Sequence, residues 1–195
     1  MSVTVRALAP AEIAHAVSDL ARLRIAVFRE WPYLYDGSTA YESDYLRNFA
    51  AAPDPVLIAA FDGDAIIGMA TASPLAAQDD ATRAPLEAAG FDVPATFYFG
   101  ESVLLPDYRG QGIGHRFFDL REAGARAAGA QVATFCAVVR PDDHPRRPAD
   151  ARDLTPFWQA RGYRPVAGAE AVFSWTDLGD AERTPHPMRF WSRAL

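Results

Sequence analysis

The stretch from Phe97 to Gly129 constrains the fold more than any other part of the chain. Residues 97–105 are rich in aromatic and branched side chains, which is typical of a strand. Pro106 ends that strand, because proline cannot donate to a sheet ladder. Three glycines follow, and an amphipathic pattern then runs to Gly129. This order predicts a buried strand, a glycine-rich turn and a helix.

The helix after the turn has two different faces. Small and apolar side chains share one face of a helical period: Ile113, Phe117, Leu120, Gly124 and Ala127. Polar side chains share the opposite face: His115, Asp119, Glu122 and Arg126. The spacing of Glu122 and Arg126 predicts an ion pair on the solvent side of this helix.

The glycine-rich turn is suited to binding an anion. Glycines let backbone N–H groups approach a ligand, and the first N–H groups of a helix lack partners at the positive end of its dipole. A tight connection without a ligand is the alternative. His115 excludes a Walker A motif, which needs Lys there, and departs from the dinucleotide fingerprint, which needs Gly there.

The segment from Leu104 to Gly114, LLPDYRGQGIG, resembles motif A of the GCN5-related N-acetyltransferases (GNAT), Arg/Gln-x-x-Gly-x-Gly/Ala. The resemblance spans nearly the whole chain in the order of its elements. It implies an α/β (α+β) fold, with a mixed, mostly antiparallel sheet and a central parallel strand pair flanked by helices. We expect one N-acetyltransferase-like domain over residues 1–195, with residues 180–195 as a docked C-terminal tail.

The rest of the chain supplies the expected elements. They are a strand at 3–8, helices at 10–28 and 41–50, a hairpin of 56–61 and 65–72, an apolar strand at 131–139, a helix at 153–161, and a last pair of strands at 163–166 and 170–175. Residues 74–94 form a long excursion, either a lid or acceptor-side insertion or a plain surface loop.

Composition excludes several classes of protein. Half of the 195 residues are hydrophobic, and the net charge of −6 argues against nucleic-acid binding and favours cationic small molecules. The single cysteine, Cys136, excludes an internal disulfide and a multi-cysteine zinc site, and no metal is expected. We expect a cytoplasmic protein without a membrane partner. The aromatic side chains of the tail are expected to dock on the core or on a second subunit of a homodimer.

An unusual loop follows the first helix. It has the sequence EWPYLYDG and carries three large aromatic side chains and two acids. Aromatic faces and carboxylates hold ammonium groups, so an amine acceptor is expected to contact Trp31, Tyr33, Tyr35 and Asp36. An aromatic flap over the core, or a dimer contact, is the alternative.

The resemblance implies acetyl-CoA as the cosubstrate, inserted between the 97–105 and 131–139 strands. The cofactor-binding residues are then Val103, Leu104, Leu105, Arg109, Gly110, Gln111, Gly112, Ile113 and Gly114. Backbone N–H groups of residues 111–114 would hold the pyrophosphate. The backbone of residues 103–105 would pair with the pantetheine arm, and the N–H of Leu104 would polarise the thioester carbonyl.

Glu101 is the leading candidate for the base that an amine needs before it attacks a thioester. Strand alternation predicts that it shares a face with Phe97, Phe99 and Val103, where apolar surroundings would favour a raised pKa. A structural Glu is the alternative reading, and Tyr98 on the other face is a weaker candidate base.

The general acid departs from the family. The family often places Tyr in the last helix, where this chain has Trp158, so Tyr163, His144, a loop tyrosine or water would protonate the thiolate. The basic side chains of residues 140–148, including Arg140, would contact phosphate or remain solvated. The sequence therefore favours an amine N-acetyltransferase over an acyl-CoA-binding regulatory module, with a nucleotide-binding oxidoreductase disfavoured.

Overall fold

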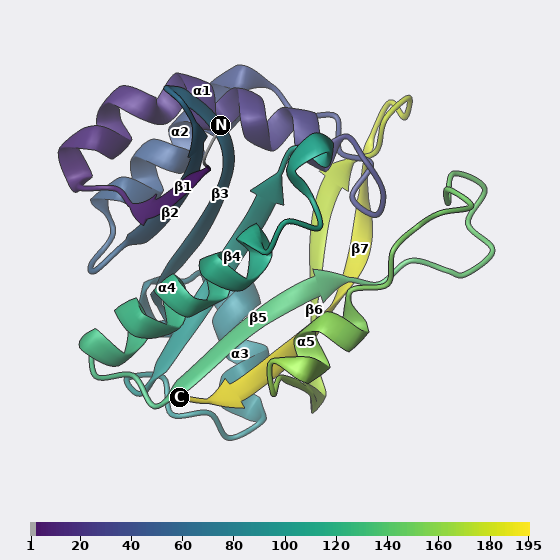
Figure 1. Ribbon diagram of the computed structural model, residues 1–195. Helices are drawn as coiled ribbons and strands as arrows, with labels where there is room; N and C mark the ends of the chain where they lie inside the picture. The colour runs from purple at the N-terminus through teal and green to yellow at the C-terminus, as the bar shows by residue number, and fades with distance from the viewer. Residues whose placement is uncertain (1–2) are drawn as a thin grey trace.

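One seven-stranded sheet organises the chain, in the order β1-β2-β3-β4-β5-β7-β6 (Figure 1). The computed structural model describes residues 3–195. The strands are β1 (Thr4–Ala7), β2 (Val56–Asp62), β3 (Ala65–Pro74), β4 (Thr96–Leu104), β5 (Val132–Val138), β6 (Arg164–Thr176) and β7 (Arg183–Ala194). The β4–β5 pair is parallel and the other neighbours are antiparallel. The predicted fold class is confirmed.

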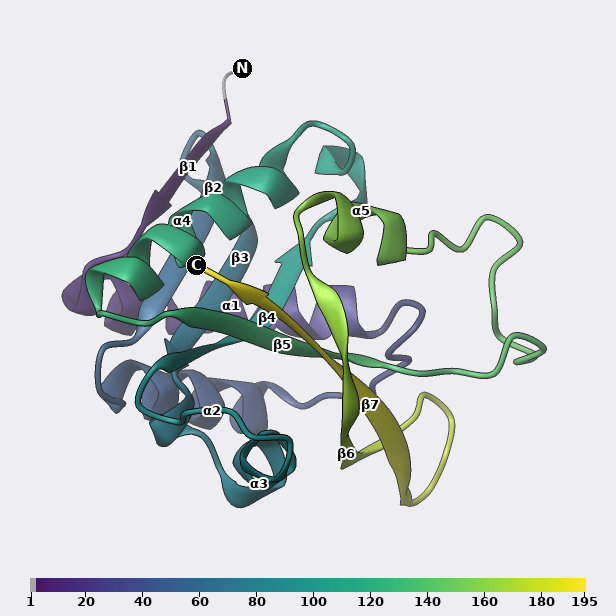
Figure 2. The same cartoon turned by 90° about the horizontal axis from the view of Figure 1, so that it is seen from below.

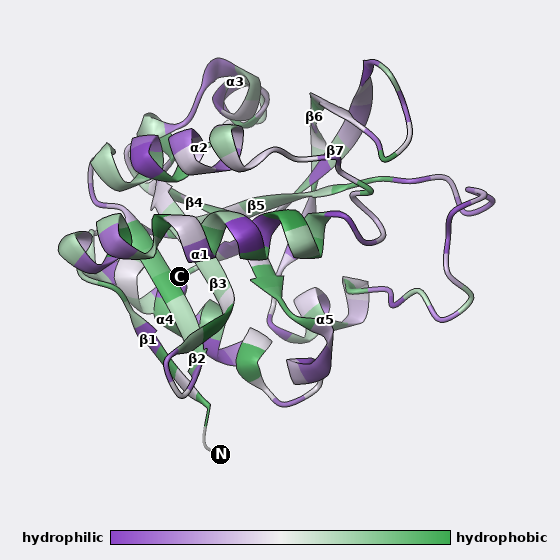
Figure 3. Ribbon diagram, turned by 90° about the horizontal axis from the view of Figure 1, so that it is seen from above, coloured by the Kyte–Doolittle hydropathy of each residue, from purple (hydrophilic) through white to green (hydrophobic). Residues whose placement is uncertain are grey.

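Helices cover both faces of the sheet (Figure 2). They are α1 (Pro10–Phe28), α2 (Thr39–Ala51), α3 (Asp80–Ala88), α4 (Ile113–Ala127) and α5 (Thr155–Ala160), with 3-10 turns at Leu75–Ala77 and Pro106–Tyr108. Apolar side chains of α1 and α3 pack on one face, and those of α4 pack on the other. The helices α1 and α2 carry both hydrophilic and hydrophobic residues, as amphipathic helices must (Figure 3).

The parallel strands β4 and β5 pair over only a short distance. The ladder runs from Thr96↔Val132 to Tyr98↔Thr134, whereas β4 continues to Leu104 and β5 to Val138. Beyond the last pair the two arrows diverge in Figure 1. The second half of β4 therefore has a ladder edge without a neighbouring strand on the β5 side.

A β-bulge interrupts β4 where it pairs with β3. Ala72 pairs with Phe99 and Ala70 pairs with Ser102, so two residues of β4 stand opposite Thr71. The predicted alternation is wrong at this point. Phe97 and Phe99 pack with α4, whereas Val103 packs with α1 and Glu101 contacts Arg24 of that same helix. The extra residue therefore reverses which side chains in the second half of β4 face α1 and which face α4.

Two further expectations about the elements need correction, whereas the expected docking of the tail's apolar side chains on the core is confirmed. The segments 163–166 and 170–175 belong to one strand, β6, and its partner is β7, which lies in the expected tail. The side chains of Met188, Phe190 and Trp191 are buried in the core. The excursion at 74–94 contains a full helix, α3, which packs Leu86 into the core cluster with Tyr98.

The faces of α4 also differ from the prediction. Glu122 is buried and pairs with Arg161 and Arg193 instead of Arg126, and its Oε1 also accepts a hydrogen bond from Tyr163. The Arg121 side chain is buried as well. Within residues 3–195, no helix is long and apolar enough to cross a membrane.

Candidate active site

The glycine-rich turn leads directly into α4. Gly110 and Gly112 have φ values of 78° and 81°, a region that L side chains disfavour, and a Cβ on either glycine would meet open space. The first helical hydrogen bond runs from the N–H of Arg116 to the carbonyl of Gly112 at 3.3 Å. The N–H groups of Ile113 and Gly114 therefore have no intrahelical acceptor, and the turn can hold an anion such as pyrophosphate.

Two predicted cofactor side chains make contacts within the protein. Arg109 donates to the carbonyl of Leu104 at 3.1 Å and pairs with Glu30 at 2.8 Å. Gln111 donates to the carbonyl of Asp107 at 3.1 Å. These contacts fix the path of the turn and engage both side chains within the protein.

The open edge of β4 begins near the turn. Leu105 donates its N–H to the carbonyl of Ile67 on β3 at 3.0 Å. Because successive N–H groups of a strand point to opposite edges, the N–H of Leu104 points to the β5 side, where the ladder with β5 has already ended. A donor is thus directed into the space between the diverging strands.

Glu101 of β4 lies in a buried polar cluster on the face of the sheet that α1 and α2 cover. Its carboxylate pairs with Arg24 of α1 and accepts a hydrogen bond from Tyr45 of α2 at 3.0 Å. Arg24 also pairs with Glu42, whose side chain is fully buried. The expected isolated carboxyl among apolar side chains is wrong, because one guanidinium lies between two carboxylates.

The charges of this cluster shift the pKa of its other members. Burial opposes the charge of Arg24, but Glu101, Tyr45 and Glu42 outweigh it and raise the pKa of Arg24. Burial first, and then the charge of Glu101, raise the pKa of the Tyr45 phenol. Tyr45 therefore stays protonated and donates to Glu101, and Arg24 stays charged.

The aromatic loop after α1 is firmly packed. Tyr33 lies between Phe28 and Trp175, with ring centroids 4.7 Å and 5.8 Å away. Arg140 donates to the carbonyls of Pro32 at 2.9 Å and Tyr33 at 2.7 Å, and it pairs with buried Asp177 at 2.8 Å. These bonds hold the loop as a fixed wall beside the sheet.

The four predicted acceptor residues separate into two groups. Burial, and then the charges of Cys136 and Glu101, raise the pKa of the Tyr33 phenol. Burial, and then a hydrogen bond and charge from Glu42, raise the pKa of the Tyr35 phenol. The Tyr33 phenol therefore lies near the charge of Glu101, and the Tyr35 phenol near that of Glu42. Trp31 instead lies against His144, with ring centroids 5.2 Å apart, and Asp36 pairs with Arg29 at 3.2 Å.

Tyr98 and Cys136 lie at the point where β4 and β5 separate. The Tyr98 hydroxyl and the Cys136 sulfur are 3.1 Å apart. Burial, followed by Cys136, raises the pKa of Tyr98, and burial raises the pKa of the Cys136 thiol to about 11. The thiol is therefore neutral, and it is buried, which makes it unreactive in the folded protein.

The residue at the family's Tyr position, one candidate general acid and one candidate phosphate contact are all engaged within the protein. Trp158 packs on Phe135 and Trp191, at 5.1 Å and 5.2 Å between centroids. Tyr163 is fully buried and donates to Glu122, so its hydroxyl is not directed to the open edge. Arg140 is engaged with Asp177 and does not offer a phosphate contact.

Sequence reasoning missed Arg24 and Glu42 as parts of the site, and it expected Arg140 to contact phosphate or remain solvated rather than to pair with Asp177. A signal existed for the first two. Arg24 falls on the apolar stripe of its helix, and Glu42 precedes Tyr45 and Leu46 on the buried face of α2, so each is a charge at a core position. No local pattern shows that Asp177 is the partner of Arg140, because the two residues are distant in the sequence.

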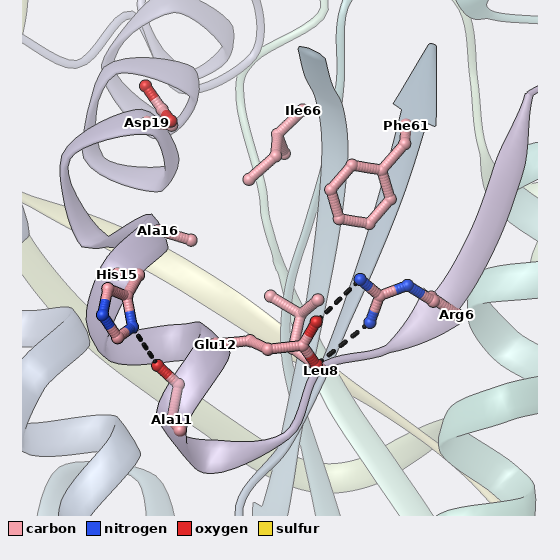
Figure 4. A pocket seen from close by; sticks show the side chains of 9 residues that line it. All are labelled: Arg6, Leu8, Ala11, Glu12, His15, Ala16, Asp19, Phe61 and Ile66. Carbon is pink, nitrogen blue, oxygen red and sulfur yellow. Dashed lines mark hydrogen bonds and ion pairs between the residues drawn. The ribbon is translucent and has the colours of Figure 1, made fainter. Parts of the chain in front are cut away.

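A cavity of about 500 Å³ lies elsewhere, between the first half of α1 and strands β1, β2 and β3 (Figure 4). Its apolar floor includes Leu8, Phe61 and Ile66. Arg6 and Glu12 at its rim already pair with each other at 2.8 Å. No group of three or more potential metal ligands is found within residues 3–195.

Comparison with known proteins identifies the family to which the chain belongs. The model of the acetyltransferase (GNAT) family matches residues 22–149, which is more than half of the chain. The chain belongs to the acetyltransferase (GNAT) family, as the sequence motif indicated. No curated protein matches the sequence.

Solved structures support the same fold. An aminoglycoside 6'-N-acetyltransferase complexed with coenzyme A has 15% identity and a TM-score of 0.61, over 98% of this chain and 96% of that one. The aminoglycoside 6'-N-acetyltransferase from Enterococcus faecium has 13% identity and the same TM-score and coverages. The protein yncA from Salmonella typhimurium, with its cofactor acetyl-CoA, has 12% identity and a TM-score of 0.59, over 100% and 95%. These neighbours are consistent with acetyl-CoA as the cosubstrate of the family fold.

Proposed function

We propose that this protein transfers an acetyl group from acetyl-CoA to a primary amine of a small-molecule or peptide acceptor, by direct attack in a ternary complex. One observation carries the proposal. The unpaired edge of β4 connects the anion-binding turn at the start of α4 with the buried carboxylate of Glu101. A ligand with a phosphate end and an extended arm fits this arrangement.

The cofactor end of the site uses the backbone. The N–H groups of residues 111–114 would hold the pyrophosphate, with Gly110 and Gly112 supplying the backbone conformation and Arg109 fixing the turn. The edge at Val103, Leu104 and Leu105 would pair with the pantetheine arm as a strand would. Acetyl-CoA supplies an acetyl group activated as a thioester.

The acceptor end of the site must remove a proton and stabilise negative charge. We assign Glu101 as the base, acting directly or through water, with Tyr45 orienting its carboxylate at 3.0 Å. The N–H of Leu104 would stabilise the developing oxyanion. A thiol has an ordinary pKa of about 8.5, so water can protonate the departing thiolate at neutral pH without a dedicated acid.

The acceptor is proposed to be a cationic amine. Two carboxylates share one guanidinium beside the open edge, and the Tyr33 and Tyr35 phenols lie near these charges. Two of the structural neighbours are named as aminoglycoside 6'-N-acetyltransferases, which is consistent with an amine acceptor. Trp31 and Asp36 would contact the outer part of a larger acceptor.

The test is acetyl transfer followed by free thiol release, with acetyl-CoA and a panel of amines that includes aminoglycosides, polyamines and peptides. Turnover with at least one amine is expected. Glu101→Gln should lower kcat about 100-fold or more and leave CoA affinity unchanged, whereas Glu87→Gln on the surface of α3 should change neither. Equal kcat in Glu101→Gln would remove Glu101 as the base.

A second candidate function is an acyl-CoA-binding regulatory module with little catalysis. It is favoured by the core position of Trp158 and by the engagement of Glu101 with both Arg24 and Tyr45. CoA binding without turnover on any amine would support this module. Binding of NADH but not CoA would contradict both functions.

A further inference from the structure

The direction of the Glu101 side chain depends on the bulge in β4. In a regular strand, Glu101 would share a face with Phe97 and Phe99, towards α4. The bulge opposite Thr71 instead turns Glu101 towards Arg24 on the α1 side. Whatever holds this bulge in place also holds Glu101 on its present side of the sheet.

Thr71 and Gly100 fit each other at the bulge. The N–H of Glu101 donates to the Thr71 hydroxyl at 3.2 Å, and Thr71 is fully buried. A Cβ at Gly100 would lie only 2.4 Å from that hydroxyl oxygen. Only glycine at position 100 therefore allows the hydroxyl to reach the displaced N–H.

Arg121 reaches the same bulge from the α4 side of the sheet. Its Nη1 lies 3.4 Å from the carbonyl of Thr71 and 3.4 Å from the carbonyl of Glu101. Its Nε donates to the carbonyl of Phe117 at 3.3 Å. The guanidinium carbon lies 4.6 Å from the ring centroids of both Phe99 and Phe118.

The burial of Arg121 is unusual. The residue is 2% exposed, and no carboxylate pairs with it among residues 3–195. Burial lowers the pKa of its guanidinium to about 10. A buried cation without an acidic partner is destabilising unless its surroundings compensate it. Here backbone carbonyls and aromatic faces compensate part of the charge, while the Nη2 of Arg121 has no hydrogen-bond partner. Two of those carbonyls flank the bulge.

We propose that Arg121 is a positioning residue that, with Thr71 and Gly100, fixes the β4 bulge and so directs Glu101 towards the acceptor side. Arg121 does not touch substrate in this scheme. It acts through the backbone of Glu101, from the opposite face of the sheet. The inference rests on the proposed function for its effect on turnover, because Glu101 is the base there.

The test combines kinetics with amide hydrogen exchange of the peptide covering residues 99–103. In Arg121→Met, kcat should fall at least 10-fold, CoA affinity should stay within twofold, and exchange of the peptide should become faster. Arg121→Lys should recover part of kcat, since one amine can still reach a carbonyl. Unchanged exchange or unchanged kcat in a folded Arg121→Met protein would overturn the proposal.

Arg161→Met is the matched control. Arg161 also lies on the Phe118 ring, at 5.0 Å, but it pairs with Asp119 and Glu122, and no hydrogen bond or ion pair joins it to β4. It should lose stability while keeping kcat and the exchange of residues 99–103. Equal kinetic losses in both variants would show a general packing effect and overturn the assignment.

Thr71→Val serves if Arg121→Met fails to fold. This change keeps the shape and removes only the hydroxyl that accepts from Glu101, so exchange at the bulge should rise and kcat should fall about threefold or more. No change in either measurement would overturn the proposal. If Glu101→Gln keeps full turnover, the base assignment fails, and exchange alone then decides whether Arg121 fixes the bulge.

Discussion

Replacing Arg140 by Met removes the group that ties the aromatic loop to the end of β6. The guanidinium makes two bonds to Asp177, at 2.8 Å and 2.9 Å, and two to the carbonyls of Pro32 and Tyr33. Both charged side chains are less than a tenth exposed. The change leaves a buried carboxylate without its cation.

The expected loss of stability follows from that carboxylate. Removing one partner of a buried ion pair costs roughly 3–5 kcal/mol. Trp175 still donates to Asp177 at 3.0 Å, so we expect the lower end, about 3 kcal/mol. In a chain of 195 residues this is a fall in Tm of roughly 6–12 °C. The loosened loop should also raise KM for the amine and leave CoA affinity unchanged.

Calorimetric melting and steady-state kinetics check both expectations. The double variant Arg140→Met with Asp177→Asn should recover part of the lost stability, because no unpaired charge remains. Arg147→Met is a surface control, since its partner Asp142 is fully exposed, and should shift Tm by less than about 2 °C. An equally small shift in Arg140→Met, or a double variant no more stable than the single one, would refute the reasoning.

Three further predictions concern other parts of the molecule. Gly112→Ala and Gly63→Ala should each lower the free energy of unfolding by about 1–2 kcal/mol, because both glycines have positive φ. Only Gly112→Ala should weaken CoA binding, as measured by titration calorimetry, and equal affinity losses in both variants would contradict the pyrophosphate site. Cys136, whose pKa is about 11, should react with a disulfide reagent at pH 8 only after denaturation, and rapid labelling of native protein would be inconsistent with its burial. Burial, and then the charge of Arg140, lower the pKa of His186, so its imidazole is neutral in the folded protein at pH 7. The free energy of unfolding should therefore decline as the pH falls below about 6.5, the pKa of an unfolded histidine, and it should level off below the lower pKa of His186 in the folded protein. His186→Phe, which keeps a ring against Trp175, should reduce that slope in melting curves between pH 7 and 5.

The part of the fold that local residues specify was predictable from the sequence. The glycine-rich turn, Pro106 and the Asp62-Gly63 hairpin each restrict the backbone by their own chemistry, and their elements lie where expected. The parallel pair followed from the apolar 131–139 strand. The family resemblance completed this prediction and is confirmed.

The rest depended on partners distant in the sequence. The period-2 rule places Glu101 wrongly, because one inserted residue opposite Thr71 reverses the alternation, and Gly100 is the single local sign of that insertion. Likewise the spacing of Glu122 and Arg126 is a local signal, whereas the actual partners, Arg161 and Arg193, come from α5's end and β7. Local periodicity cannot report which cation tertiary packing brings to a buried carboxylate.

The unpaired edge of β4 also has a thermodynamic consequence. Most sheets expose such edges at their margins, where another protein chain can add a strand. This edge lies inside the sheet, between β4 and β5, so a thin, extended ligand can complete the ladder there more easily than a polypeptide. A ligand that does so binds the folded state alone and stabilises it in proportion to the logarithm of its concentration. The cosubstrate would then supply hydrogen-bond partners for the unpaired part of β4, and a higher concentration of it in the cell would raise the free energy of unfolding of the protein.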